Sequence, residues 1–148
     1  MIKEDPNNIG LFSIRYLKNH QDMIDYVISR TFAGFIVKEK NPLESIPFML
    51  LRERYLDILK IVRSDGTKLK FVPKKLQDEY VQIPMEAVKN HPSAIVFASV
   101  DALISYPDIS IYACAMNWNN YALVPIAVRV KYPLKKYVFE YKSRHGLK

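Results

Sequence analysis

Cysteine is nearly absent from this chain of 148 residues, and Cys114 is its only copy. A single cysteine forms no internal disulfide and no thiolate zinc cluster, and it indicates a reducing compartment or no dependence on redox state. Glycine is also scarce, with four residues against nine prolines. This balance argues against an all-β meander and against a glycine-rich phosphate-binding loop. It favours short helices joined by tight corners.

Long apolar runs are missing as well. The longest, residues 93–104, is interrupted by Asp101 and is shorter than the roughly 20 residues that cross a bilayer. Residues 1–8 lack the apolar core of a signal peptide. With 49% hydrophobic and 25% charged residues, the sequence predicts a soluble, cytoplasmic single domain over residues 1–148, without a transmembrane segment.

The positive charge is concentrated near the C-terminus. The formal net charge is +7, yet residues 1–128 carry 15 Lys and Arg against 14 Asp and Glu. The last 20 residues carry seven Lys and Arg against Glu140 alone, a net charge of +6. Such asymmetry indicates either a patch for nucleic acid, anionic lipid or an acidic partner, or a terminal element that lysines keep solvated.

A helical pattern recurs along the second half of the chain. In each copy a tyrosine is followed by isoleucine three positions later and by a small apolar residue seven positions later. The three copies are Tyr55, Ile58 and Val62; Tyr80, Ile83 and Ala87; and Tyr106, Ile109 and Ala113. These tyrosines lie 25 and 26 residues apart, and Tyr132 follows 26 residues later. The spacing predicts an internal repeat of short helices.

Each predicted unit continues with a polar corner and a second apolar set. The corners are residues 63–66, 89–92 and 117–120, and the apolar sets are residues 69–72, 95–98 and 123–126. The residues that close the sets are Leu76, Leu103 and Val130. One unit is therefore a helix, a corner and a shorter helix, whose apolar stripe is too small to be buried without a stacked neighbour.

Two groups of side chains are expected to hold neighbouring units together. The recurring tyrosines would cover the seam, with the ring buried and the hydroxyl at the rim. Ile83, Ala87, Ile95 and Phe97 would form the buried stripe between the first and third units. The competing interpretation is a β-strand at residues 68–72 or 95–98, because short apolar runs do not distinguish the two structures.

The sequence therefore predicts a mainly α fold of short helix–corner–helix repeats, stacked as a small solenoid or bundle. A minor β element stays open in the N-terminal half, at residues 32–37, or in the tail. The expected parts are a divergent N-terminal part over residues 1–54, three repeat units over residues 55–130, and a basic, aromatic C-terminal cap or tail over residues 131–148.

One unit resembles a known repeat. Residues 86–99, EAVKNHPSAIVFAS, run from a first helix into Ala-Val, a polar corner and then Ala-Ile-x-Phe-Ala-Ser. This pattern resembles a tandem α-helical repeat of unknown function, about 25 residues per unit, found in proteins of intracellular bacterial pathogens, protists and large DNA viruses. The resemblance covers residues 55–130, although residues 69–73 depart from the Phe-Ala-Ser ending. It implies an interaction scaffold, either cytoplasmic or delivered into a host cytoplasm as an effector, and carries over no functional residues.

No catalytic or metal-binding pattern is present. His20, His91 and His145 are too few and too scattered for a metal triad. Residues 111–116 have the pattern of a buried helix, so Cys114 is expected to be a small hydrophobic residue and not a nucleophile. Nucleophile-elbow, Walker, zincin and Rossmann motifs are also missing. We expect no catalytic residue, no metal and no cofactor, and an enzyme with an unrecognised site stays open as an alternative.

The C-terminal segment holds the best candidate binding residues, because it interleaves aromatic and basic side chains. These residues are Lys131, Lys135, Lys136, Tyr137, Tyr141, Lys142 and Arg144. Its spacing fits two structures. Tyr137, Phe139 and Tyr141 alternate as on a strand, whereas Leu134, Tyr137, Val138 and Tyr141 form a helical stripe that would cap the last unit.

Two functions follow from these patterns. The first is a non-enzymatic helical-repeat module that binds another protein and, if the resemblance holds, acts on a host protein as a pathogen or viral effector. The alternative is a nucleic-acid-binding protein that uses the basic C-terminal tail.

Overall fold

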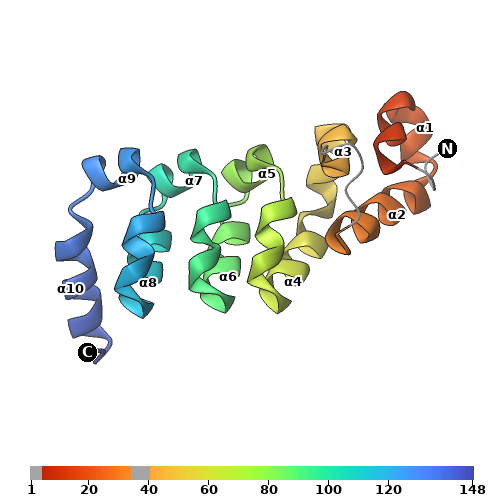
Figure 1. Cartoon of the computed structure of the whole chain (residues 1–148). Coiled ribbons are helices and arrows are strands. Elements are labelled where there is room, and N and C mark those ends of the chain that lie inside the picture. Colours follow the sequence, from red (N-terminus) through yellow and green to blue (C-terminus); the bar gives the residue numbers. More distant parts are fainter. Residues whose placement is uncertain (1–4, 35–40) are drawn as a thin grey trace. The chain divides into compact units, whose positions relative to one another are not determined.

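The computed structural model describes residues 5–34 and 41–148, and every regular element within these ranges is helical (Figure 1). The predicted mainly α fold class is confirmed, and no strand occurs among the described residues. No helix in these ranges is both long enough and apolar enough to cross a membrane. The chain divides into two compact units, the first with the described residues up to Leu56 and Phe71–Pro73, the second with Asp57–Lys70 and Lys74–Lys148.

The first unit consists of helical elements, which are η1 (Pro6–Leu11), α1 (Ile14–Lys18), α2 (Gln21–Phe32), η2 (Pro42–Ser45), α3 (Phe48–Leu51) and η3 (Arg52–Arg54), where η marks a 3₁₀ segment. Of these elements, η1, α1 and η2 begin at a capping side chain. The Ser13 hydroxyl accepts a hydrogen bond from the Tyr16 N–H (3.1 Å), which has no partner inside its helix. Arg54 forms an ion pair with Asp25 and so joins η3 to α2.

From Tyr55 onward, an α-helix, a 3₁₀ segment and a short α-helix follow one another three times before a last helix. The first set is α4 (Tyr55–Ser64), η4 (Gly66–Phe71) and α5 (Lys74–Glu79). The next are α6 (Gln82–Asn90), η5 (Pro92–Phe97) and α7 (Val100–Ser105), then α8 (Asp108–Met116), η6 (Trp118–Leu123) and α9 (Ile126–Lys131), and last α10 (Leu134–Arg144). Figure 1 shows α4, α6, α8 and α10 in one row and α5, α7 and α9 in a second, and α8 packs against both α6 and α10.

The prediction of a single shorter helix after each corner is wrong, because the structure has a 3₁₀ segment and a separate α-helix there. The apolar sets lie in or beside the 3₁₀ segments η4, η5 and η6, and α5, α7 and α9 are separate helices that follow them. Asp65 and Asn117 explain the tight turns, because each side chain accepts a hydrogen bond from the N–H two residues ahead (3.0 Å in both cases). The strand interpretation of residues 68–72 and 95–98 is also wrong, because these residues lie in or beside η4 and η5. Of residues 32–37, Phe32 ends α2 and residues 35–37 lie outside the described ranges.

The core of the second unit follows the predicted stripe in part. The three stripe residues that are buried are Ile83, Ala87 and Ile95. Phe97 is only half-buried, so its ring is not the central contact that the pattern predicts. Val130 is 81% exposed and closes no core, because Val128 takes the buried position of α9.

The recurring tyrosines do not share one environment. Tyr55, Tyr80 and Tyr132 are half-buried, as predicted for residues that cover a seam. The Tyr132 hydroxyl donates a hydrogen bond to the Ile104 carbonyl at the end of α7 (2.5 Å). Tyr106 is 51% exposed, so its ring does not cover the contact between neighbouring units as predicted. The prediction of a buried ring at every seam is therefore wrong at Tyr106.

A buried amide joins α5 to the corner that precedes α7. Gln77 Nε2 donates to the Phe97 carbonyl (3.2 Å), and Gln77 Oε1 accepts from the Ser99 N–H (2.8 Å). The Lys74 ammonium donates to the same carbonyl, and burial lowers the pKa of Lys74 against an opposing effect of Asp78. These bonds satisfy backbone groups of the corner that would be costly to bury without partners.

Gly66 lies where the chain passes closest to α6. Its N–H donates to Asn90 Oδ1 (2.8 Å), and a Cβ on Gly66 would lie 2.1 Å from the Ala87 carbonyl oxygen. A backbone oxygen at that distance has no rotamer by which to move away. Only glycine therefore fits at the start of η4 in this packing.

We predict that Gly66→Ala lowers the free energy of unfolding by about 1 to 3 kcal/mol, because the added methyl group overpacks a backbone contact. Urea unfolding followed by circular dichroism measures the change. Gly10→Ala is the matched control: its Cβ would meet no atom closer than the Ser45 carbonyl oxygen at 3.4 Å. We expect a change of about 0.5 kcal/mol or less for the control, and equal midpoints for the two variants would contradict the packing at Gly66.

Candidate functional site

The C-terminal candidate residues lie on helices. Six of the seven are in α10, and Lys131 ends α9. The helical interpretation of this segment is therefore correct and the strand interpretation is wrong. Leu134 and Val138 are the buried residues of α10, which packs against α8.

Helical geometry divides the candidate residues instead of gathering them into one patch. Lys135 and Lys142 lie on one side of α10, and Tyr141 and Arg144 line a different pocket. Lys136 is exposed, Tyr137 is half-buried, and neither lines a described pocket. Lys131 is placed by a local contact, since its ammonium lies 5.4 Å from the centre of the Tyr132 ring.

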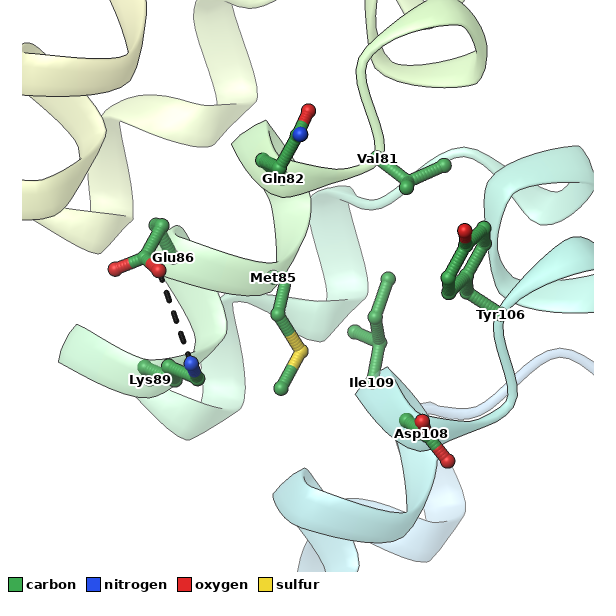
Figure 2. Close-up of a pocket in the computed structure, with 8 residues that line it drawn as sticks. All are labelled: Val81, Gln82, Met85, Glu86, Lys89, Tyr106, Asp108 and Ile109. Carbon is green, nitrogen blue, oxygen red and sulfur yellow. Dashed lines mark ion pairs between the residues drawn. The ribbon is translucent and has the colours of Figure 1, made fainter.

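A pocket of about 310 Å³ lies between the start of α8 and the exposed side of α6 (Figure 2). In Figure 2, Met85 and Ile109 point toward one another, and Val81 and Tyr106 form one end. We call this the α6–α8 pocket, and its lining residues are Val81, Gln82, Met85, Glu86, Lys89, Tyr106, Asp108 and Ile109.

A second pocket of about 330 Å³ continues from the first toward α10. The two share Met85, Lys89 and Asp108, so they form one elongated surface, which we call the groove. The other lining residues of this α8–α10 pocket are Ile111, Tyr112, Tyr141, Arg144 and His145. The groove thus draws its lining from three successive helices of one row.

Aromatic contacts fix the α10 end of the groove. The Tyr141 ring meets Tyr112 edge to face, with 6.4 Å between the ring centres, and stacks on His145 at 4.0 Å. His145 Nδ1 is also hydrogen-bonded to the Tyr141 carbonyl (2.9 Å). Tyr141 is therefore a packing residue as well as a lining residue.

The charges along the groove are of both signs. Glu86 already has two cationic neighbours, with Lys89 at 3.7 Å and Arg63 at 3.3 Å. Asp108 lies in the first turn of α8, where a carboxylate stabilises the positive end of the helix dipole. Arg144 is exposed and has no ion-pair partner among the described residues. A ligand that follows the groove therefore meets an open cation at its α10 end.

A third pocket, of about 310 Å³, contains Lys135 and Lys142 together with aromatic side chains. We call it the Trp118 pocket, after the residue that η6 contributes; the rest of its lining is Lys135, Val138, Phe139 and Lys142. Trp118 stacks on Tyr121 with 4.7 Å between ring centres and 14° between planes. The Arg129 guanidinium lies 5.2 Å from the centre of the same Tyr121 ring. This layered contact orients the indole at the surface.

The sequence analysis names Phe139 in the aromatic pattern but not among the candidate binding residues, and it leaves out Trp118 and the groove. Trp118 stands in a segment expected to be only a polar corner, and a lone tryptophan there was the available signal. The groove residues come from helices far apart in the sequence, and no local pattern connects them.

The structure offers no catalytic arrangement among the residues it describes. No three His, Cys, Asp or Glu side chains in the described ranges are grouped to hold a metal. His91 follows α6 and is exposed, and His20 Nδ1 is hydrogen-bonded to the Tyr16 carbonyl (2.8 Å). Burial raises the pKa of the Cys114 thiol to about 11. These environments belong to caps and core, and the groove and the Trp118 pocket are left as candidate binding surfaces.

Comparisons with known proteins give no relative: no family model matches this chain, and neither a curated protein nor a solved structure matches it significantly.

We predict that Cys114 is inert toward a thiol reagent in the native protein. The thiol is fully buried and its pKa is about 11, so at pH 8 it is almost entirely protonated, and the thiolate is the reactive form. A disulfide reagent that releases a coloured product should react with almost no thiol in the folded state and with one per chain in guanidinium chloride. Rapid reaction of the native protein would contradict the burial of α8.

Proposed function

We propose that this chain is a helical-repeat module, without enzymatic activity of its own, that binds an extended segment of another protein in the groove. The continuity of the groove across α6, α8 and α10 is the observation that carries the proposal. An elongated surface built from equivalent helices suits a ligand longer than a single side chain.

The order of elements supports a stacked-repeat interpretation. Three times an α-helix, a 3₁₀ segment and a short α-helix follow one another, and successive first helices lie side by side (Figure 1). Each first helix buries the isoleucine that lies three residues after the recurring tyrosine, namely Ile58, Ile83 and Ile109. A core shared in this way leaves one side of the row of first helices available to a ligand.

Exposure at Tyr106 makes room at the α6–α8 end. Where the equivalent tyrosines are half-buried, Tyr106 stands at the pocket rim beside Val81 (Figure 2). Met85 is half-buried at the centre, and its flexible thioether adapts to the shape of an apolar ligand group. This end is therefore suited to an apolar anchor residue of the bound segment.

Charge identifies the other feature of the bound segment. Glu86 is already paired, whereas Arg144, in the α8–α10 pocket, forms no ion pair with any residue that the structure describes. A carboxylate on the ligand would form a charge-assisted, two-point hydrogen bond with it. The proposed ligand is therefore an extended peptide segment with one apolar anchor and one acidic residue.

The resemblance to repeats of intracellular pathogens and large DNA viruses adds a setting to this proposal. In that setting the segment belongs to a host protein, and the chain acts as an effector in a host cytoplasm. The peptide-binding proposal itself rests on the groove and is tested separately from this setting.

We predict that selection of linear peptides displayed on phage enriches sequences with an apolar and an acidic residue. Arg144→Glu should weaken binding of the enriched peptides roughly tenfold or more, because it places like charges together in the α8–α10 pocket. Met85→Glu should have a comparable effect by placing a charge against the apolar anchor. Fluorescence anisotropy with labelled peptide measures both.

Lys136→Glu is the control, since it changes charge on the same helix at a residue that lines neither pocket of the groove. It should leave peptide affinity nearly unchanged, and thermal melts should show that all three variants are folded. The proposal fails if no peptide is enriched, or if Arg144→Glu and Lys136→Glu bind the enriched peptides equally.

A further inference from the structure

The Trp118 pocket is not used by the proposed peptide site and differs from it in chemistry. It contains two lysines and two aromatic residues, and no carboxylate lines it. Both pockets of the groove, by contrast, include Asp108. All of its lining residues except Trp118 belong to residues 129–148, which hold +6 of the total net charge of +7.

Its aromatic groups are exposed to an unusual degree. Trp118 is 41% exposed and Phe139 is 73% exposed, although burial of such rings is normally favourable. Phe139 lies on α10 between Lys135 and Lys142, so one helical stripe presents a cation, a ring and a second cation in order. Exposed rings between cations bring together a stacking surface and groups that neutralise anions.

The lysines are available to a ligand. Neither Lys135 nor Lys142 forms an ion pair with an acid in the described part of the chain. The single acid of the segment, Glu140, does not line the pocket. An anion bound here therefore displaces no internal partner.

The indole is held in place before any ligand arrives. Trp118 stacks on Tyr121, which in turn lies against the Arg129 guanidinium. The Asn117 side chain accepts a hydrogen bond from the Asn119 N–H (3.0 Å) and fixes the backbone on both sides of Trp118. A ring ordered in advance loses less conformational entropy when a second ring stacks on it.

From these observations we infer that the Trp118 pocket binds single-stranded nucleic acid. A base would stack on the aromatic surface of Trp118 and Phe139, while Lys135 and Lys142 neutralise neighbouring phosphates. Stacking with a flat π-surface and phosphate neutralisation together are the means by which single strands are bound without base-specific hydrogen bonds. The inference is independent of the peptide groove, and either one can fail without the other.

The protein provides its own reporter, because Trp118 is its only tryptophan. We predict that a single-stranded oligothymidine of about 20 nucleotides quenches the indole fluorescence, as expected for base stacking. The affinity should fall steeply between about 50 and about 200 mM salt, because bound phosphates release counterions. Heparin, which has charge but no bases, should bind without a comparable quench.

Variants separate stacking from charge. Phe139→Ala should weaken binding of the oligonucleotide about 5- to 100-fold. Lys135→Ala and Lys142→Ala should each weaken it and reduce the magnitude of the salt slope by about 0.7. Lys136→Ala is the matched control, one residue away on the same helix and outside the pocket lining, and should leave the slope unchanged.

Three results would overturn the inference. One is the absence of any oligonucleotide binding at low salt. Another is binding with no quench, or with equal effects of Lys135→Ala and Lys136→Ala, which would indicate diffuse attraction to the basic segment. The third is self-association of a protein that binds no nucleic acid: the sedimentation coefficient would rise with protein concentration, and Phe139→Ala would return it to the monomer value. That outcome would assign the exposed rings to contact between two copies of the chain.

Discussion

The shortness of the helices is the constraint on which the rest of this structure depends. The α-helices of the described chain have between 4 and 12 residues, and isolated helices shorter than about 12 to 15 residues are marginal in water. Each helix is therefore stabilised mainly by the neighbours that it packs against. The corners matter for the same reason, since a short helix has a large share of unpaired backbone groups. Gln77 meets this requirement by bonding the Phe97 carbonyl and the Ser99 N–H of the next corner.

The sequence pattern predicts the helices well where a spacing of three and four residues is the dominant signal. Ile83 and Ala87 are buried on α6 as that spacing requires. It predicts the second part of each unit poorly, because an apolar run of four residues fits a strand, an α-helix or a 3₁₀ turn equally well. Groups outside the apolar run determine which of these structures forms. One is the Asp65 side chain, which accepts a hydrogen bond from the Thr67 N–H at the start of η4. The spacing of apolar residues also does not predict which distant segments lie close together, as Gly66 and Ala87 do.

The candidate sites show the same division between what is local and what is not. The basic character of α10 can be read from composition, and the cations do lie at the surface. The neighbours of each cation cannot be predicted from composition. Trp118 of η6 lines the same pocket as Lys142, and Met85 and Lys89 of α6 line the α8–α10 pocket. Whether a lysine belongs to a binding surface depends on these neighbours. Lys135 and Lys136 are adjacent in sequence, yet of the two only Lys135 lines one of the three pockets described above.

Both proposed sites depend on the packing of one helix. With about 100° of rotation per residue, α10 turns Lys135, Phe139 and Lys142 toward Trp118, and Tyr141 and Arg144 toward the groove. Its buried residues, Leu134 and Val138, hold it against the rest of the second unit. The net charge of the C-terminal segment therefore does not act as one patch. It is divided between a surface where Arg144 stands beside a carboxylate-containing groove and a surface where two lysines flank an exposed ring. The different neighbours of these cations, with Asp108 in the groove and aromatic rings in the Trp118 pocket, are the reason we propose different ligands for the two surfaces.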